Sequence, residues 1–498
     1  MSRMFDSLLN HDDLRRWRVC TRRFWLHRRN VPARVALDAP DPGLDAALRA
    51  SYPLADAIPA PGALSEWTRA MRQTLHCLDA DTVVPEGWAI LGACLTSEDR
   101  AQARIDVLTC GSHGLRLFKV RCATAGDEAD VDAVALWTHV AARCGLRVQG
   151  VGLLLVDTDF TYPGHGCYAG LFREVDLAPV LGSRPVAAWL DSMRACERGP
   201  QPPATPGAHC RQHGGCEFID QCQACAPAAG LPAPDPQASL EIVGRELAAE
   251  LRAAGHVDVR SLPLQSLANA RHRRAVQAVQ QGGPVLEPEV AGLMHALPYP
   301  RHYLRFDTIG LAVPLWPGTR PYQVMPFQWS CDVQSADGFI ARHGFLADAQ
   351  GGDPRRAFAR ALLQALGDSG AVLAYNAGFE RNRIRDLAQL FDDLAPALDA
   401  VLARMVDLFQ TARAHYYHPA MAGSWSFKSI GRVVAPERQA LLDTMDGADT
   451  QSAQAVFARL QQRGLDAATR QQLRAALQAY GQTQAEVVRR LATLLENA

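Results

Sequence analysis

Strand-like and helical patterns alternate along two long stretches of this chain, and this alternation constrains its fold more than any single motif does. In the first stretch, strand-like runs at 103–110 and 115–122 precede a helical pattern at 127–145 and a buried strand at 146–157. Strands that alternate with helices are typical of α/β domains, in which helices cover a sheet. Residues 1 to about 195 therefore read as one α/β unit.

The alternation resumes after residue 298 and continues almost to the end of the chain. Strand-like runs occupy 302–310, 320–333, 371–376 and 405–409, helical patterns occupy 354–370 and 378–391, and two terminal helices cover about 451–496. We expect a second mixed sheet, flanked by helices. No internal repeat relates the two stretches.

A segment rich in proline and alanine, at 224–239, separates the two stretches. This composition is typical of an extended linker. The residues that follow have the apolar spacing of short helices, as at 244–255 and 272–283. The predicted parts are a domain at 1–226, a linker with a helical bridge at 227–298, and a domain at 299–498.

Composition excludes several classes of protein. The chain has 498 residues, of which 48% are hydrophobic, so it is long enough for two or three domains with cores and is not a disordered chain. No apolar run approaches the roughly 18 residues of a membrane span, and the N-terminus lacks the hydrophobic stretch of a signal peptide. We expect a cytoplasmic protein without a membrane partner.

Basic residues are concentrated near the N-terminus although the net charge of the whole chain is only -1. Seven arginines lie between His11 and Asn30, against only two acids in that segment. Arginine matches phosphate with two parallel hydrogen bonds, so this segment is either a nucleic-acid surface or a solvated helix face. Lysine occurs only twice, as Lys119 and Lys428.

The chain has thirteen cysteines, which is an odd number, and they are scattered over a long sequence. This indicates reduced thiols with a metal-binding subset rather than a disulfide framework. Cys210, Cys216 and Cys222 have five residues between successive members, and Cys225 follows closely. Cys20 stands far upstream. Four converging thiolates suit either an iron-sulfur cluster or structural zinc, and spacing alone does not choose between them.

The early cysteine in the sequence CTRRFWL, the α/β pattern and the closing row of cysteines together resemble the iron-sulfur nucleases of the PD-(D/E)XK superfamily. These RecB-like proteins include CRISPR-associated and helicase-associated members. The resemblance implies a restriction-endonuclease-type core whose two ends are clamped by a [4Fe-4S] cluster. The ligands that it implies are Cys20, Cys210, Cys216 and Cys222, with Cys225 as a spare and zinc as the alternative metal.

The acidic site that this resemblance implies is incomplete. Active members need an aspartate on one strand and an acidic-x-lysine triplet on the next, because carboxylates hold Mg²⁺ and the lysine positions the attacking water. Asp106 supplies the first acid, but Lys119, Val120 and Arg121 stand where the triplet is expected. The following helix also lacks the usual glutamine and tyrosine. We expect a nuclease-type fold that binds nucleic acid through Lys119 and Arg121 without cutting it, although both cations are equally compatible with a solvated strand.

The second stretch resembles an uncharacterised bacterial domain with an RNase H-like fold, often joined to a RecB-like module in this order. The resemblance rests on sequences such as YPRHYLRFDTIG, VLAYNAGFERNRI and YYHPAMAGSWSFKSI. That domain is similar to the DEDD 3'-5' exonucleases, in which four carboxylates hold two metal ions. The implied fold class is therefore α/β, with a RecB-like core and an RNase H-like mixed sheet joined by helices.

The DEDD motifs are also depleted. The first motif appears as Arg305-Phe306-Asp307, so one acid has become a cation. The second motif is represented by Asn376 and Glu380, and the last appears as Tyr480 followed by Gln484 instead of an acid. Asp407 is a candidate third acid, although helix capping is an equal alternative for it. Glu380 also suits a solvated first helical turn.

Two further features of this half are candidates for ligand contacts. Lys428 matches a position of the resembled domain and is a candidate phosphate ligand. The aromatic residues of HYYHP and SWSF stack on bases in one interpretation and pack in the core in the other.

These observations predict a nucleic-acid binding protein of nuclease ancestry, with DNA as the expected partner, and leave its protein partners unknown. Arg305, Asn376, Lys428 and Tyr480 are the expected contacts in the second domain. One alternative is an active exonuclease that uses Mg²⁺ or Mn²⁺ on Asp307, Glu380 and Asp407, with Asp106 as the residual acid of the first domain. The other alternative is a scaffold that binds protein.

Overall fold

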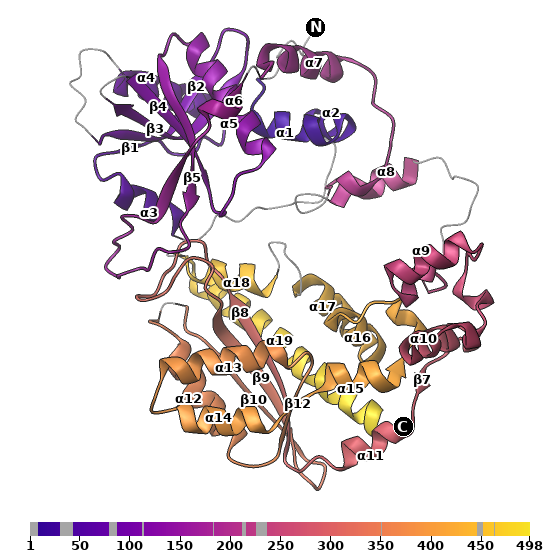
Figure 1. Cartoon of the computed structure of the whole chain (residues 1–498). Helices are drawn as coiled ribbons and strands as arrows, with labels where there is room; N and C mark the ends of the chain where they lie inside the picture. Colours follow the sequence, from indigo (N-terminus) through magenta and orange to yellow (C-terminus); the bar gives the residue numbers. More distant parts are fainter. Residues whose placement is uncertain are drawn as a thin grey trace. The chain divides into compact units, whose positions relative to one another are not determined.

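The chain folds as a mixed α/β protein in a computed structural model that describes residues 8–29, 43–78, 87–111, 114–182, 184–211, 216–225, 237–349, 351–445, 452–462 and 464–498. It divides into two compact units, each with its own sheet (Figure 1). Unit 1 comprises 1–227 and 310–323, and unit 2 comprises 228–309 and 324–498. The predicted helical bridge therefore belongs to unit 2, and most of the predicted linker, 226–236, lies outside the described residues.

Unit 1 is built on a six-stranded sheet in the order β1-β2-β3-β4-β5-β6. The strands are β1 (Asp56–Ala57), β2 (Ala89–Thr96), β3 (Gln102–Gly111), β4 (Gly114–Arg121), β5 (Val148–Val156) and β6 (Phe172–Asp176). The β2-β3-β4 meander is antiparallel, and β5 runs parallel to β4. The parallel pair requires a crossover, which the helix α5 (Glu128–Arg143) provides.

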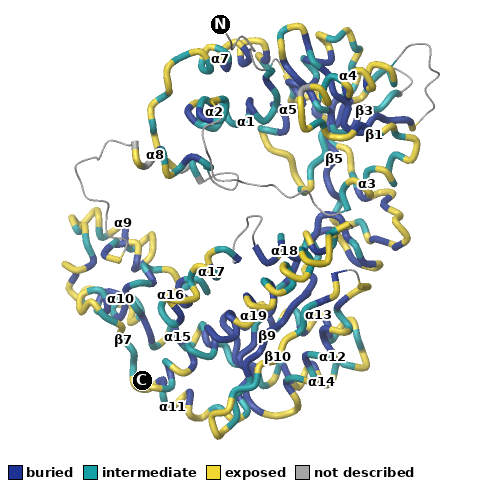
Figure 2. Tube along the Cα trace, turned by 180° about the vertical axis from the view of Figure 1, so that it is seen from behind, coloured by how far each residue is buried: buried dark blue, intermediate teal, exposed yellow. Residues whose placement is uncertain are grey.

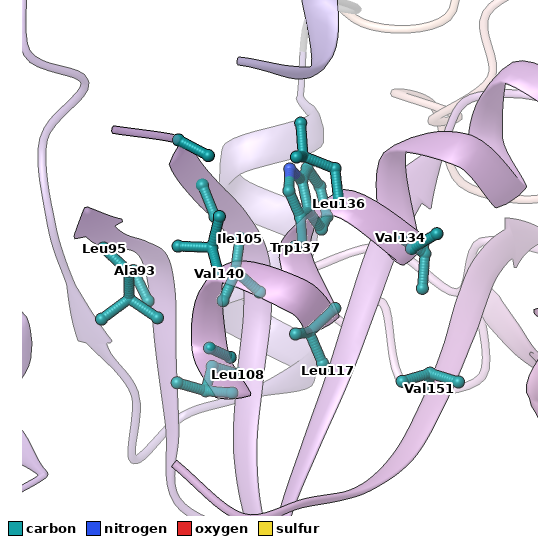
Figure 3. Close-up of a cluster of buried hydrophobic side chains, with 14 of the residues drawn as sticks. Ala93, Leu95, Ile105, Leu108, Leu117, Val134, Leu136, Trp137, Val140 and Val151 are labelled. Atoms are coloured by element: carbon teal, nitrogen blue, oxygen red, sulfur yellow. The ribbon is translucent and has the colours of Figure 1, made fainter. Parts of the chain in front are cut away.

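Helices cover both faces of this sheet. Besides α5, the helices of unit 1 are α1 (His11–Val19), α2 (Thr21–Arg28), α3 (Leu44–Ser51), α4 (Leu64–Cys77), α6 (Ala178–Leu181), α7 (Val186–Arg198) and α8 (Ile219–Cys225), with the 3-10 turn η1 (Ala208–Arg211), and not all of them contact the sheet. Figure 3 shows Val134, Trp137 and Val140 of α5 in one apolar cluster with Ile105 and Leu117 of the strands. α5 begins with a capping box at Asp127 and Asp130, which fixes where its apolar face meets the sheet.

Unit 2 is built on a five-stranded sheet in the order β10-β9-β8-β11-β12. The strands are β8 (Arg301–Ile309), β9 (Met325–Gln334), β10 (Ile340–Leu346), β11 (Ala371–Ala374) and β12 (Met405–Asp407). The first three strands form an antiparallel meander, and β11 and β12 run parallel to β8. Numbered within the sheet, the strand order is 3-2-1-4-5.

The helices of this sheet lie on its two faces (Figure 1). One face carries α12 (Arg355–Leu366), α13 (Gly378–Leu390) and α14 (Ala395–Ala403), and the other carries α18 (Ala453–Leu460) and α19 (Ala467–Glu496). Figure 2 shows β9 as deeply buried between these layers. Because facing residues of antiparallel strands share a face, Arg305 with Ser330 and Asp307 with Gln328 lie on the α19 side, together with residues that contact α19.

The remaining elements of unit 2 are short. They are η2 (Leu240–Val243), α9 (Arg245–Ala253), η3 (Val259–Ser261), η4 (Leu264–Ser266), α10 (Ala270–Gln281), β7 (Val285–Leu286), α11 (Glu289–His295), α15 (Leu408–His415), β13 (Tyr416–Tyr417), η5 (Pro419–Met421), α16 (Phe427–Val434), η6 (Pro436–Arg438) and α17 (Gln439–Met445). A small antiparallel pairing of β7 with β13 ties the helical bridge to this unit.

One expected strand is shorter than its sequence pattern indicates. The run 320–333 was expected to be extended throughout, but β9 begins only at Met325. Pro321 has no backbone N–H to donate, and Tyr322 adopts a left-handed backbone conformation with φ 58°, so neither residue continues a ladder. Residues 310–323 instead pack in unit 1, where Ala312 and Val313 join an apolar cluster with Val156 and Leu171.

Candidate functional site

The four cysteines of the predicted metal set line one cavity of unit 1. Cys20 caps the N-terminus of α2, Cys210 lies in η1, Cys216 precedes α8, and Cys222 is within α8. Phe218, which is almost fully buried, forms part of the wall. The fold thus brings a cysteine near the N-terminus to a row of cysteines almost 200 residues later.

The surroundings of two of these thiols, Cys216 and Cys222, favour the neutral form. Burial raises the pKa of Cys216 and of Cys222, and the nearby Cys210 adds to both shifts. Arg22 acts in the opposite direction on Cys222. Metal binding would therefore release protons here, because a thiolate is the ligand. Among the described residues, no three His, Cys, Asp or Glu side chains are grouped closely enough to hold one metal ion, and the side chain of Cys225 is not among them.

The arginines near the N-terminus are engaged within unit 1. Arg23 contacts Glu217 at 2.6 Å and so joins α2 to the segment that carries the later cysteines, whereas Arg28 contacts Glu197 at 3.0 Å and joins α2 to α7. The other contacts are Arg15 with Asp12, Arg16 with Glu217, Arg18 with Asp132, Arg22 with the carbonyl of Pro202, and Arg29 with the carbonyl of Glu197. Of these arginines, Arg16 and Arg23 therefore contact the segment that carries the later cysteines, and the others contact α1, α5, α7 or the residues after α7.

The candidate acid of the first sheet is held by the backbone. Asp106 lies on β3, and its Oδ2 accepts the N–H of Val120 at 2.9 Å. Val120 lies just beyond the part of β4 that pairs with β3. Burial raises the pKa of this carboxyl, and the charge of Lys119 opposes that shift more than any other charge does. Lys119 thus places an ammonium charge near the one acid that the motif retains.

The groups around Lys119 form a crowded, partly buried cluster. Its Nζ lies 5.1 Å from the centre of the Trp137 ring, and the His11 ring meets the same indole edge-on. Burial, followed by the charge of Lys119, lowers the pKa of His11 to about 4. Arg121 points elsewhere, because its Nε lies 3.1 Å from the buried Asp130 of α5.

The second sheet holds an ion pair at the predicted DEDD position. Arg305 on β8 places Nη1 3.1 Å from Oε1 of Glu380, in the first turn of α13, and 3.1 Å from the carbonyl of Tyr375. The Glu380 side chain has no exposed surface, and burial raises its pKa against the effect of Arg305. The Phe427 ring packs on the guanidinium at 4.5 Å. A side-chain cation therefore pairs with the acid that the sequence analysis proposes as a metal ligand.

Asp307 is bound by two amides on the same face of the sheet. Gln328 on β9 donates to Oδ2 at 3.1 Å, and Gln484 on α19 donates to Oδ1 at 3.2 Å. Gln328 also donates to the carbonyl of Leu477 at 2.8 Å. The amide of Gln484 occupies the position at which the last DEDD acid was expected, so a neutral hydrogen bond replaces a charged ligand there.

The third candidate acid lies near Glu380 but also has a structural role. Asp407 ends β12, and its carboxylate caps α15 by accepting the N–H of Phe409 at 3.0 Å. Its charge raises the pKa of Glu380 and of Tyr375. Both interpretations of Asp407 therefore find a basis in the structure: a helix cap, and an acid whose charge reaches the Arg305–Glu380 pair.

The remaining predicted contacts differ in their surroundings. Asn376 is exposed in a left-handed turn with φ 59° directly before α13. Lys428 donates to the carbonyl of Asp443 at 3.3 Å. Tyr480 is only 2% exposed, so its ring packs in the interior instead of presenting a surface for a ligand. Tyr416 and Tyr417 are 1% exposed each, which favours the core-packing interpretation of the aromatic segment.

Gln328 is the site residue that the sequence analysis missed. It lies directly opposite Asp307 in the antiparallel register of β8 and β9. A buried amide in the middle of an apolar strand was the available signal, but its partner depends on a register that the hydrophobic pattern did not fix.

The fold and site define an α/β protein with two large sheets. Each of these sheets carries an acidic side chain that has a lysine or arginine of the same chain nearby. Residues 302–426 match a family that is described as a domain of unknown function (DUF2779). This match spans the second sheet from β8 to β12 and ends just before α16. No curated protein and no solved structure matches the chain. None of the helices in the described ranges is long and apolar enough to cross a membrane.

Proposed function

We propose that this protein binds nucleic acid through a framework derived from nucleases and does not hydrolyse it. The observation that carries the proposal is the pairing of Arg305 with the buried Glu380, at 3.1 Å, in the place where a DEDD exonuclease binds metal. Because a guanidinium stays charged at any physiological pH, the neutralisation of this acid is permanent. A divalent ion beside it would meet electrostatic repulsion as well as the loss of a ligand.

The order of elements in both units supports nuclease ancestry. In unit 1, a helix, three antiparallel strands, a crossover helix and a parallel strand follow one another as in the RecB-like core. In unit 2, the order 3-2-1-4-5 with one antiparallel meander is the arrangement of RNase H-like domains. Topology alone assigns no activity, so the proposal depends on the chemistry of the two sites.

The two sites have the same kind of substitution. Lys119 lies beside Asp106 in the first, and Arg305 binds Glu380 in the second. Loss of acids would abolish metal-dependent cleavage, whereas cations in the same positions remain compatible with a polyanion nearby. We therefore propose binding without cleavage, and DNA as the partner.

We also propose a [4Fe-4S] cluster held by Cys20, Cys210, Cys216 and Cys222. Their shared cavity supports a common ligand set, and thiolates are the usual ligands of such clusters. The choice of cluster over zinc follows from the resemblance to iron-sulfur nucleases. In the clamped fold, the cluster would hold α2 against α8 and stabilise unit 1.

Binding and cleavage can be tested together on the full chain. We expect labelled single-stranded and double-stranded DNA to bind with an affinity that falls steeply as salt rises, since phosphate contacts release counterions. We expect the DNA to remain intact in Mg²⁺ or Mn²⁺. Degradation that requires a metal and is lost in D307N would support the exonuclease alternative. An affinity that is undetectable or insensitive to salt would contradict nucleic-acid binding and favour a protein scaffold.

A further inference from the structure

A groove follows the exposed side of α19 next to β10, the edge strand of the second sheet. Two hollows form it, of about 230 Å³ over the strands and about 470 Å³ along the start of α19. They adjoin, because Gln478 lines both. Neither Arg305 nor Glu380 lines this groove, so it is separate from the ion pair described above.

The sequence creates this groove with two glycines. Gly344 on β10 faces Ser330 on β9, and its missing side chain leaves the floor open. On α19, a Cβ at Gly481 would lie only 2.3 Å from the side chains of Gln328 and Ser330, so the glycine lets the helix approach β9 closely. On the side of α19 toward β10, Gln478 and Gln482 form the wall.

Positive charge dominates the groove. Arg342 lines the hollow over the strands, and Arg470 and Arg474 line the hollow along α19. Arg470 and Arg474 donate to the backbone carbonyls of Leu460 and Ala347, both at 3.3 Å, and these contacts do not neutralise their charge. None of the described residues that line the two hollows is acidic.

The only acid close to Arg342 is already shared. Asp332 lies 2.9 Å from Arg489 and 3.7 Å from Arg342 among the described residues. One carboxylate therefore faces two guanidinium groups, and an excess of positive charge remains. The sequence of α19 reinforces this, since it contains no Asp or Glu from Ala467 to Ala485.

Amide side chains alternate with the arginines along the wall. Gln471, Gln478 and Gln482 are exposed and can both donate and accept hydrogen bonds. Gln328 lines the inner end of the groove, where its Oε1 is buried without a partner among the described residues while its Nε2 donates to Asp307. The groove therefore leads from a basic helix face to the amide that holds Asp307.

We propose that this groove binds an unpaired strand of nucleic acid, with phosphates on Arg342, Arg470 and Arg474 and base edges on the glutamines. The assignment rests on the proposed function. It adds where on the protein the nucleic acid binds and that the bound strand is unpaired. Hollows of a few hundred Å³ are of the size that holds a small molecule, such as a single base, and not a duplex. Base edges are also free for amide hydrogen bonds in a single strand, and the phosphate backbone meets the arginines in the same way.

The test compares three variants of the full chain with the unaltered protein. R470A/R474A removes two phosphate contacts, and G344V fills the floor of the groove. A Cβ at Gly344 would meet its nearest neighbours at 3.4 and 3.8 Å, which are ordinary contacts, and the unfolding temperature of G344V checks that the two further carbons of valine also fit. The matched control is R360A/R385A, which removes two exposed arginines from α12 and α13 on the other side of the sheet.

We measure affinity for a labelled single strand of DNA, the RNA of the same sequence and the DNA duplex over a range of salt. For R470A/R474A we expect at least tenfold weaker single-strand binding and a salt slope shallower by about 1.4, or roughly 0.7 per phosphate contact. We expect G344V to weaken single-strand binding with an unchanged unfolding temperature, and the control to bind normally. Normal binding by R470A/R474A and G344V would show that the groove is not the binding site, while the proposed function would stand. A preference for the duplex would contradict the assignment of an unpaired strand. If the unaltered protein binds no nucleic acid, the proposed function itself fails.

Discussion

Arg305 Nη1 lies 3.1 Å from Oε1 of Glu380, and the carboxylate has no exposed surface. The guanidinium comes from the middle of β8, and the acid comes from the first turn of α13. The pair therefore joins a strand to the helix that follows the neighbouring strand β11. A cation and an acid of the chain itself therefore hold these two elements together.

Breaking this pair from one side should destabilise unit 2. We expect R305M to lower the free energy of unfolding by about 3–5 kcal/mol, because it leaves a buried carboxylate without a counterion. The double variant R305M/E380L should recover much of that loss, since neither charge remains. Urea denaturation followed by circular dichroism measures both. Equal stability of R305M and the unaltered protein would mean that the pair contributes nothing.

Introducing acids at positions 305 and 484 should create a metal site. In R305D/Q484D, two carboxylates return to the positions where the DEDD pattern expects them, beside Asp307 and Glu380. We expect this variant to be less stable than the unaltered protein without metal, because like charges repel, and to gain thermal stability with Mn²⁺ by ligand linkage. Adding D307N should remove the gain. A folded R305D/Q484D that does not respond to Mn²⁺ would show that the carboxylates do not converge.

The titration of Glu380 should reduce stability at rising pH. Burial raises its pKa above the ordinary value of 4.5, so the folded state retains the proton at pH values where the unfolded chain has lost it. The associated stability is present below about pH 4.5 and is lost as pH rises through the folded-state pKa. E380Q lacks this dependence. The free energy of unfolding of E380Q minus that of the unaltered protein should therefore rise as the pH increases above about 4.5, and a flat difference would contradict the raised pKa.

If the cavity cysteines hold the proposed cluster, removal of one of them should lower the metal content of the protein. We expect C216S, purified without oxygen, to contain far less iron and sulfide than the unaltered protein, and to lose stability in unit 1. The matched control is C331S, which changes a buried cysteine of β9 away from the cavity. Iron, sulfide and zinc are quantified in all three proteins. Zinc in place of iron would identify a structural zinc site, and equal metal content in C216S would exclude Cys216 as a ligand.

Two helical glycines should respond to alanine in opposite ways. A Cβ at Gly481 would lie 2.3 Å from the buried side chains of Gln328 and Ser330, so G481A should destabilise the protein by about 1–3 kcal/mol. Gly292 in α11 is exposed and its Cβ would meet nothing within 4 Å, so G292A should stabilise it by up to about 1 kcal/mol. Thermal unfolding of both variants tests the signs. A stable G481A would mean that α19 can move away from β9.

Periodicity predicted most elements that build the two sheets. The expected strand at 302–310 corresponds to β8, and the expected helix at 378–391 corresponds to α13. These segments carry long apolar patterns with glycine or proline at their ends, so local physics determines them. The α/β class is confirmed for the same reason.

Contacts between residues far apart in the chain could not be predicted from the sequence. The arginines between His11 and Asn30 suggested a surface patch or a solvated face, but their partners, such as Glu197 and Glu217, lie about 170–190 residues away. The contact between Gln328 and Asp307 depended on the register of β8 and β9. Nothing local distinguishes an arginine that faces solvent from one that faces an acid brought in by the fold.

The loop at 310–323 belongs to unit 1 although the strands on either side of it belong to unit 2. Its Ala312 and Val313 complete an apolar cluster with Val156, Tyr162 and Leu171, which 1–227 alone would leave uncovered. Cutting the gene at the proline-rich segment would therefore not yield two independent halves. The first fragment would expose this apolar cluster and tend to aggregate, and the second would carry the apolar loop without the cluster that it covers.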